Sequence, residues 1–169
     1  MLSLEIGSGK NPQPGYIHLE RFIDRNSIGL VDVCGDAHNL PFYNRSFDSV
    51  LMFGVFEHFG IFEIQEVMLE IVRVLKEGGV FRFDVPDFDW FMERYIHPES
   101  LGPGRTTQWI LHAIFGVQDG SGMEHRWGWN EGRLREFLMK PNWNFKDIRL
   151  ISRQWRDPEP NHLIWECVK

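Results

Sequence analysis

Glycines and acidic residues follow the first apolar segment of the chain and could bind a nucleotide-like ligand. The motif with Glu5, Gly7 and Gly9 ends this segment, and Glu20 ends the next one. Glycines at such a point let the backbone approach a ligand closely, and an acidic residue at the tip of a second strand can accept hydrogen bonds from both hydroxyls of a ribose. A glycine-containing turn beside a surface glutamate would give the same pattern, because a short glycine pair is a weak signal.

A second polar stretch, residues 35–42, lies before the next apolar segment and contains Asp36 and Ala37. An aspartate carboxylate together with a neighbouring backbone amide can read the amino group and the ring nitrogen of adenine. Two apolar members of the stretch, Leu40 and Phe42, are expected in the core instead. Asp36 and Ala37 are therefore candidates for contact with the base of the same nucleotide.

Phe53, Gly54 and His58 follow the apolar run Ser49–Phe53, whose continuous hydrophobicity is typical of a strand covered on both faces. Open α/β sheets bind ligands outside the carboxyl ends of their strands, so this exit is a third candidate binding position. His58 is the best-placed candidate for a general base, and His125, in a glycine-rich loop, is the second. A lone histidine is more often structural, and that alternative stays open for both.

Hydrophobic periodicity places these stretches between strands and helices. Apolar residues recur at three- and four-residue steps from Ile61 to Leu75, which predicts an amphipathic helix that Gly78 and Gly79 stop. Asn130 is the expected N-cap of a helix over 131–139. The other expected elements are strands at 2–6, 16–20, 30–34, 49–53, 80–85, 147–151 and 162–168, and helices at 89–96 and 107–115. This alternation predicts an open, mostly parallel α/β sheet whose last two strands pair antiparallel at one edge.

Short connections between the first strands predict that the sheet lacks some of its usual helices. Residues 7–15 separate the first two expected strands and residues 21–29 the next two, whereas a parallel crossover normally takes a dozen or more residues. One face of the sheet should therefore lack some or all of its helices. Because an uncovered apolar face is normally hidden by a partner, we hypothesise a homodimer.

Composition and charge restrict the class of protein. Hydrophobic residues make up 43% and charged residues 25% of 169 positions, which fits one folded domain over 1–169 and excludes wholesale disorder. The net charge of −6 disfavours a general electrostatic grip on nucleic acid or an anionic membrane. No stretch approaches the roughly 20 apolar residues of a membrane span, and the two cysteines indicate neither a disulfide framework nor a metal pair. We expect a cytoplasmic protein with no nucleic-acid partner, no membrane partner and no metal.

The order of these motifs resembles that of the class I S-adenosylmethionine-dependent methyltransferases, and within them the small methyltransferase type 11-like proteins. The resemblance covers Leu2 to Asp87, about half of the chain, and rests on LEIGSG, GDAHNLPF, SFD, FEHF and RVLKEGGVFRFDVPD in this order. It implies a Rossmann-like open sheet with some helices missing. The sequence departs from the family pattern at Asn11, where a third glycine often occurs, and lacks both the helix after the glycine motif and the N-terminal helix that caps the cofactor.

The resemblance also implies a role for each candidate residue. The implied cofactor-binding residues are Glu5, Gly7, Gly9, Glu20, Asp36, Ala37, Phe53 and Gly54. The glycine motif would line the methionine and ribose side of S-adenosyl-L-methionine, and Glu20 would hold the ribose hydroxyls. Asp36 and Ala37 would contact the adenine, while Phe53 and Gly54 would face the methionine.

We therefore expect an enzyme that moves a methyl group from S-adenosylmethionine to an unidentified acceptor, either a small molecule or a sugar-related metabolite. Methyl transfer asks mainly for alignment of the two reactants, and a general base is needed only when the acceptor carries a proton, as a hydroxyl does. Two alternatives stay open. The first is a catalytically degenerate binding or interaction module with the same fold. The second is a nicotinamide-dependent oxidoreductase, which Pro12 at the third glycine position disfavours.

Overall fold

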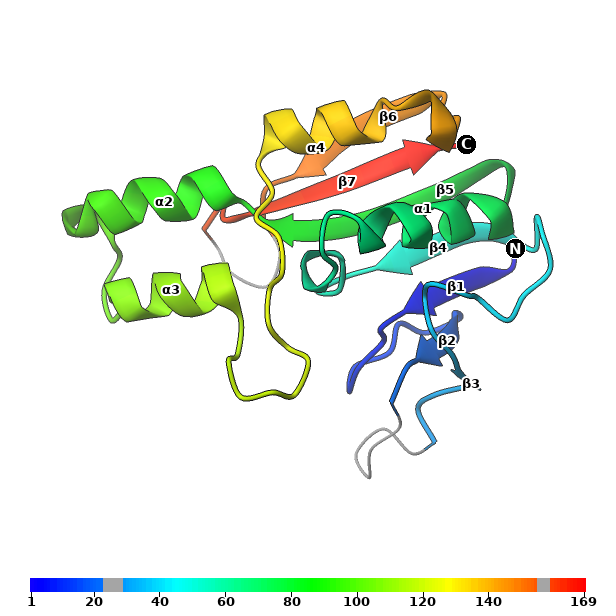
Figure 1. The fold of residues 1–169 in the computed structure, drawn as a ribbon, viewed down its shortest axis with the longest axis horizontal. Helices are drawn as coiled ribbons and strands as arrows, with labels where there is room; N and C mark the ends of the chain where they lie inside the picture. Colours follow the sequence, from blue (N-terminus) through cyan, green and yellow to red (C-terminus); the bar gives the residue numbers. More distant parts are fainter. Residues whose placement is uncertain (23–28, 155–158) are drawn as a thin grey trace.

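The computed structural model describes residues 1–22, 29–154 and 159–169, which form a single seven-stranded sheet with four α-helices (Figure 1). The strand order is β3-β2-β1-β4-β5-β7-β6. The strands are β1 Ser3–Ile6, β2 Ile17–Glu20, β3 Val33–Cys34, β4 Phe47–Met52, β5 Leu75–Pro86, β6 Asp147–Ser152 and β7 His162–Val168. Strands β1 to β5 pair parallel, and β7 lies antiparallel between β5 and β6. The expected mostly parallel sheet with an antiparallel C-terminal edge is confirmed.

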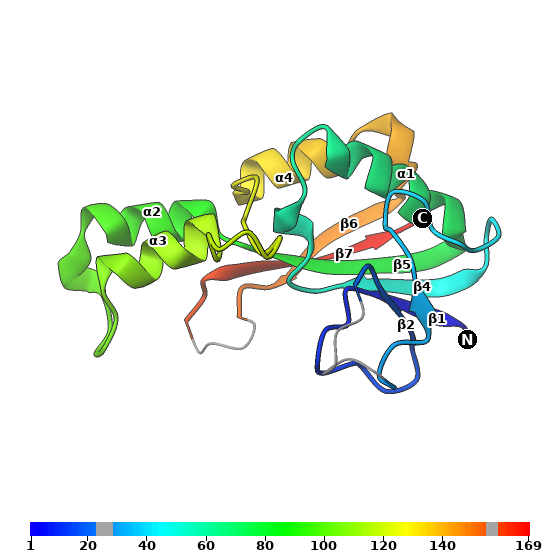
Figure 2. The same ribbon diagram turned by 60° about the horizontal axis from the view of Figure 1, so that its bottom comes forward.

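Two of the four helices lie on the sheet and two extend beyond it. The helices are α1 Glu63–Val74, α2 Phe88–Ile96, α3 Thr107–Phe115 and α4 Glu131–Leu138, with short 3-10 turns η1 Phe56–His58, η2 Pro98–Ser100 and η3 Pro141–Trp143. Helices α1 and α4 cover the same face of the sheet, whereas α2 and α3 form a hairpin past the end of β5 (Figure 2). That hairpin has a small apolar cluster of its own, formed by Trp90, Phe91 and Ile110.

The main core lies between the sheet and α1 and α4. Leu4, Val50 and Phe81 are register partners on neighbouring strands, and each is at most 1% exposed. The apolar positions that the sequence predicts for α1 are buried against them, which confirms the amphipathic helix. The expectation that glycines stop this helix is wrong. Helix α1 ends at Val74, and Gly78 lies inside β5 at φ +76°.

The opposite face of the sheet carries no helix among the described residues, as the short connections predict (Figure 2). Strand β4, expected to be covered on both faces, therefore has helices on one face only. The bare face is nevertheless polar. Arg82 and Arg149 both pair with the carboxylate of Glu166, with N–O distances of 2.7 and 2.9 Å, and the Ser3 and Ser49 hydroxyls are hydrogen-bonded at 2.7 Å. These groups are hydrated at little cost, so this part of the bare face needs no cover, and the homodimer stays a prediction.

The two cysteines differ in their exposure. Cys34 is exposed, Cys167 is buried, and both are free thiols. None of the helices in the described part of the chain has the length and apolarity that crossing a bilayer needs.

Candidate functional site

The carboxyl ends of β1 and β4 meet at a tight glycine turn. Gly7 follows β1 at φ +74°, and its N–H donates to the Leu19 carbonyl of β2 at 2.9 Å. A Cβ atom on Gly7 would lie 2.3 Å from Cγ2 of Val55, which follows β4. Glycine is required at this position because both the positive φ and the close approach exclude a side chain. Gly9, at φ +58°, has open space where a side chain would stand, so this side of the turn is accessible to a ligand.

Glu20 closes the same turn from the end of β2. Its carboxylate accepts a hydrogen bond from the N–H of Gly9, which leaves its second oxygen for a ligand. Between the two glycines, the Ser8 hydroxyl is buried and has no hydrogen-bond partner among the described residues. Glu5 is placed differently, because its carboxylate accepts from the N–H of Gln13 at 2.8 Å and lies 3.0 Å from Nδ1 of His18. Glu5 therefore supports the turn through these two contacts.

Asp36 lies next to the end of β2, since the N–H of Gly35 donates to the Glu20 carbonyl at 2.9 Å. Its carboxylate accepts from the backbone N–H of His38 at 2.9 Å and pairs with Arg21 at 3.2 Å. Partial burial opposes ionisation, but the hydrogen bonds to His38 and the Arg21 charge outweigh it, so the pKa of Asp36 is lowered. Asp36 is thus a fixed, negatively charged group at this edge, and Ala37 beside it is 7% exposed.

Gly54 turns the chain at the end of β4, with φ +66°, directly after Phe53. Its N–H donates to the carboxylate of Asp84 at 2.7 Å. Asp84 lies in β5 and is 0% exposed. The sequence analysis did not single out this aspartate. A carboxylate inside the apolar stretch VFRFDVP was the signal that could have found it, because ionisable groups are rarely buried unless they are paired.

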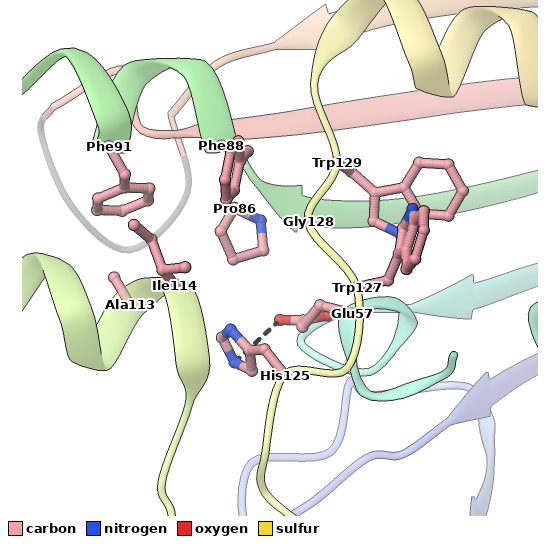
Figure 3. A pocket seen from close by; sticks show the side chains of 10 residues that line it. All are labelled: Glu57, Pro86, Phe88, Phe91, Ala113, Ile114, His125, Trp127, Gly128 and Trp129. Atoms are coloured by element: carbon pink, nitrogen blue, oxygen red, sulfur yellow. Dashed lines mark ion pairs between the residues drawn. The ribbon is translucent and has the colours of Figure 1, made fainter. Parts of the chain in front are cut away.

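Glu57, His58 and His125 come together just beyond this turn. The glutamate and His58 lie on η1, and His125 comes from the loop between α3 and α4. The two imidazole rings are 5.0 Å apart at their centroids, and Nε2 of His125 lies 3.9 Å from Oε1 of Glu57 (Figure 3). The structure thus joins both predicted histidines into one cluster. It adds Glu57, which is 4% exposed and which the sequence analysis did not assign.

Backbone contacts fix the loop that carries His125. The N–H of Arg126 donates to the Glu57 carbonyl, and the N–H of His125 donates to the Phe115 carbonyl, both at 2.9 Å. The loop starts at Gly116, where φ is +68° and a Cβ atom would lie 2.2 Å from the Met123 carbonyl oxygen. This close approach, which only glycine permits, holds His125 beside η1.

Burial keeps all three side chains of the cluster uncharged near neutral pH. It raises the pKa of Glu57 to about 8, with the negative charge of Asp84 adding to the effect. Burial and the neighbouring His58 lower the pKa of His125 to about 4. The pKa of His58 is also lowered by burial, although its contact with the Glu124 carbonyl opposes the shift. Two neutral imidazoles, each with one nitrogen lone pair, therefore lie beside a protonated carboxyl group.

A small pocket opens beside the cluster toward the α2–α3 hairpin (Figure 3). Its free volume is about 10 Å³, room for about one water molecule. Its walls combine Glu57 and His125 with aromatic and apolar side chains, among them Phe88, Phe91 and Trp127. Trp129 also lines it, is 2% exposed, and lies 5.2 Å from the Phe137 ring of α4 between ring centroids.

Comparison with known proteins identifies the fold around this site. Residues 5–83 match the model of the family described as "Methyltransferase domain". A demethylmenaquinone methyltransferase of Thermotoga maritima is 47% identical over 47 residues, which are 28% of this chain and 20% of that protein. The match thus spans about a fifth of the length of this curated relative.

Two solved structures share the fold at low sequence identity. A possible histamine N-methyltransferase from Thermotoga maritima superposes with a TM-score of 0.67 and 17% identity, over 99% of this chain and 82% of that one. The Burkholderia thailandensis 1,6-didemethyltoxoflavin-N1-methyltransferase, solved with 1,6-didemethyltoxoflavin and S-adenosylhomocysteine bound, gives a TM-score of 0.63 and 16% identity, over 99% of this chain and 70% of that one. The expected Rossmann-like methyltransferase fold is confirmed.

Proposed function

We propose that this chain, whose residues 5–83 match a methyltransferase domain and whose fold is that of a solved methyltransferase, is a class I S-adenosylmethionine-dependent enzyme that transfers a methyl group from S-adenosyl-L-methionine to a small-molecule acceptor. The observation that carries the proposal is the glycine turn after β1. There, the open side of Gly9, the unpartnered hydroxyl of Ser8 and the second carboxylate oxygen of Glu20 lie at one sheet edge. This arrangement fits a polar ligand with hydroxyl groups bound close to the backbone.

The cofactor-binding part of the proposal assigns one role to each side of the turn. Gly7 and Gly9 allow the cofactor to approach the backbone, and Glu20 accepts hydrogen bonds from its ribose hydroxyls. Asp36 and the backbone of Ala37 hold the adenine. Bound S-adenosylmethionine supplies an activated methyl group on its sulfonium, so the protein's task is to align the acceptor with that group.

The acceptor part of the proposal uses the end of β4. Phe53 and Gly54 face the methionine moiety, while His58 and His125 face the acceptor. Nδ1 of His58 lies 3.0 Å from the Glu124 carbonyl oxygen, which can only accept, so this nitrogen carries the hydrogen and Nε2 keeps the lone pair. His58 can therefore present Nε2 to a proton on the acceptor, which is the role of a general base.

The aromatic lining of the pocket favours a flat or largely apolar acceptor, which would have to widen a cavity that now has room for about one water molecule. Phe88 and Trp127 offer ring surfaces on which a planar molecule could stack. The relatives named above act on demethylmenaquinone and 1,6-didemethyltoxoflavin, both small molecules. Once cofactor binding has been measured, a screen of small molecules for methyl transfer would identify the acceptor.

Calorimetric titration with S-adenosylhomocysteine tests the cofactor, with NAD as the competing ligand. We expect binding at one site per chain for the first ligand and none for the second. Glu20→Ala should weaken binding about 5- to 150-fold, the range for removal of a buried hydrogen-bonding partner. Glu66→Ala, which removes an exposed carboxylate on α1, serves as the matched control and should bind as the native chain does.

A folded chain that binds neither ligand would contradict the proposal and favour the degenerate binding module. Binding of NAD instead would favour the oxidoreductase. If Glu20→Ala binds S-adenosylhomocysteine with native affinity, the assignment of Glu20 to the ribose is wrong even though the cofactor is right.

A further inference from the structure

We propose that Glu57, His58 and His125 together bind one divalent cation of the zinc type. Each side chain offers one donor atom, and the three donor atoms lie within 4.8 Å of one another. The sequence predicts no metal, because the histidines lie 67 positions apart and neither belongs to a metal-binding spacing. Only the folding of the 116–128 loop onto η1 brings them together.

The spacing of the donor atoms is wider than in a tetrahedral zinc site and would have to shorten when the cation binds. With bond lengths of about 2.0–2.2 Å, ligand atoms in such a site are about 3.3 Å apart. Nε2 of His125 and Oε1 of Glu57 are already at 3.9 Å. That contact is too long for a hydrogen bond, so the pair is not held together by one, and a cation between the two atoms would need only small side-chain rotations.

Both histidines are oriented as metal-binding histidines usually are. Such a histidine normally donates its second ring N–H to a carbonyl or carboxylate, which fixes the ring and leaves the other nitrogen for the metal. Nδ1 of His58 donates to the Glu124 carbonyl at 3.0 Å, which leaves Nε2 for a cation. The ring of His125 has the backbone carbonyls of Ala113 and Ile114 beside it, which favour a ring N–H on that side.

Glu57 supplies an independent observation that points to a ligand. The residue is 4% exposed, and Oε2 of its carboxyl group has no hydrogen-bond partner among the described residues. A buried polar atom without a partner is costly and is rare in folded proteins. A cation held by both oxygens of the carboxylate, with release of the carboxyl proton, would remove this cost, whereas an aromatic or apolar neighbour would not.

The donor set also selects the chemical class of the cation. Two imidazole nitrogens and one carboxylate oxygen suit zinc and its first-row neighbours, and they do not suit Mg²⁺ or Ca²⁺, which prefer all-oxygen sites. Three protein ligands leave the fourth position of zinc open. Glu57 and His125 both line the pocket, so a cation held by them would lie at its wall. An acceptor oxygen or a water could take that open position. Because Nε2 of His58 would then be a ligand, the cation would replace His58 as the group that promotes loss of the acceptor proton, and this use of the cation rests on the proposed function.

Metal titration of the chain tests the inference without any methyl transfer. The chain is first treated with a chelator and then titrated with Co²⁺, and binding is monitored by visible absorption. The affinity for Zn²⁺ is then measured by displacement of the bound Co²⁺. We expect one cation per chain and an absorption typical of four-coordinate cobalt. Glu57→Gln and His125→Gln should each weaken binding at least tenfold, because each removes one of three ligands. His97→Gln, at an exposed histidine on the surface, should leave binding unchanged.

Two results would overturn the inference. The first is a folded chain, checked by circular dichroism, that binds neither Co²⁺ nor Zn²⁺. The second is binding that survives the substitutions of Glu57 and His125, since the cation would then lie elsewhere. If Glu57→Gln does not fold, His125→Gln and His58→Gln carry the test. Titration with S-adenosylhomocysteine in the presence of the chelator separates this inference from the proposed function, because it reports on the cofactor alone.

Discussion

Replacing Gly7 with alanine should be far more damaging than the same change at Gly9. Both glycines have positive φ, at +74° and +58°, which costs an alanine about 1–2 kcal/mol. Only at Gly7 would the new Cβ also meet Cγ2 of Val55, at 2.3 Å. Forcing an extra methyl group into such a contact costs about a further 1–3 kcal/mol. We expect Gly7→Ala to lower the free energy of unfolding by about 2–4 kcal/mol, after the smaller entropy loss of alanine is included.

Urea unfolding of four variants isolates the contact with Val55. Gly9→Ala should cost only the backbone strain, about 1 kcal/mol. In Gly7→Ala/Val55→Ala the clashing Cγ2 is gone, so the double variant should be more stable than the sum of the single effects predicts, by about 1–3 kcal/mol. Equal losses for Gly7→Ala and Gly9→Ala, or additive effects of Gly7→Ala and Val55→Ala, would refute the close approach of β1 and β4 at this turn.

Two further predictions concern ionisation away from the site. Hydrogen bonds from Arg73 lower the pKa of Glu70, against the effect of partial burial, and the Leu40 N–H adds to them at 2.7 Å. Because the carboxylate is stabilised in the folded state, Glu70→Gln should reduce the free energy of unfolding by about 1 kcal/mol above pH 4.5, the unfolded pKa, and the difference should vanish as the pH falls through the lower folded pKa. Urea curves for both chains across this pH range measure it, and a pH-independent difference would contradict the assignment. Burial raises the pKa of the Cys167 thiol to about 12, so a thiol reagent should modify only the exposed Cys34 in the native chain and both cysteines in urea; rapid modification of both without urea would show that Cys167 is accessible.

Sequence signals correctly predicted those features that depend only on neighbouring residues in the chain, such as a helix cap or the buried face of a helix. The side chain of Asn130 accepts from the N–H of Arg133 at 2.9 Å, as an N-cap does, and α4 starts at the next residue. The periodicity of α1 placed its buried face correctly. The predicted end of this helix at Gly78 and Gly79 was wrong, because strand pairing determines where the helix ends. Strand β5 begins at Leu75 because Leu75 already pairs with Phe47 of β4, so the helix ends before the glycines are reached.

The polarity of the bare face of the sheet could not be predicted from composition. Missing helices were predictable from the lengths of the connections, but the polarity of the exposed face depends on which residues share a row across the sheet. Arg82, Glu166 and Arg149 lie on three different strands, and the register brings them into one row. A sheet that lacks helices on one face can remain hydrated when such rows are charged, without a second copy to cover it.

One part of the candidate site could be predicted from the sequence and another part could not. The glycine turn and Glu20 were predictable because each ends a strand, and parallel strands bring their carboxyl ends to one edge. The cluster of Glu57, His58 and His125 was not, because it depends on a loop whose path is set by Gly116 and by the hydrogen bond from Arg126 to the Glu57 carbonyl. The same packing buries Glu57, partly buries both histidines, and leaves one carboxyl oxygen of Glu57 without a partner among the described residues. An arrangement that costs stability in this way is expected where a ligand repays it, and the metal titration decides whether that ligand is a cation.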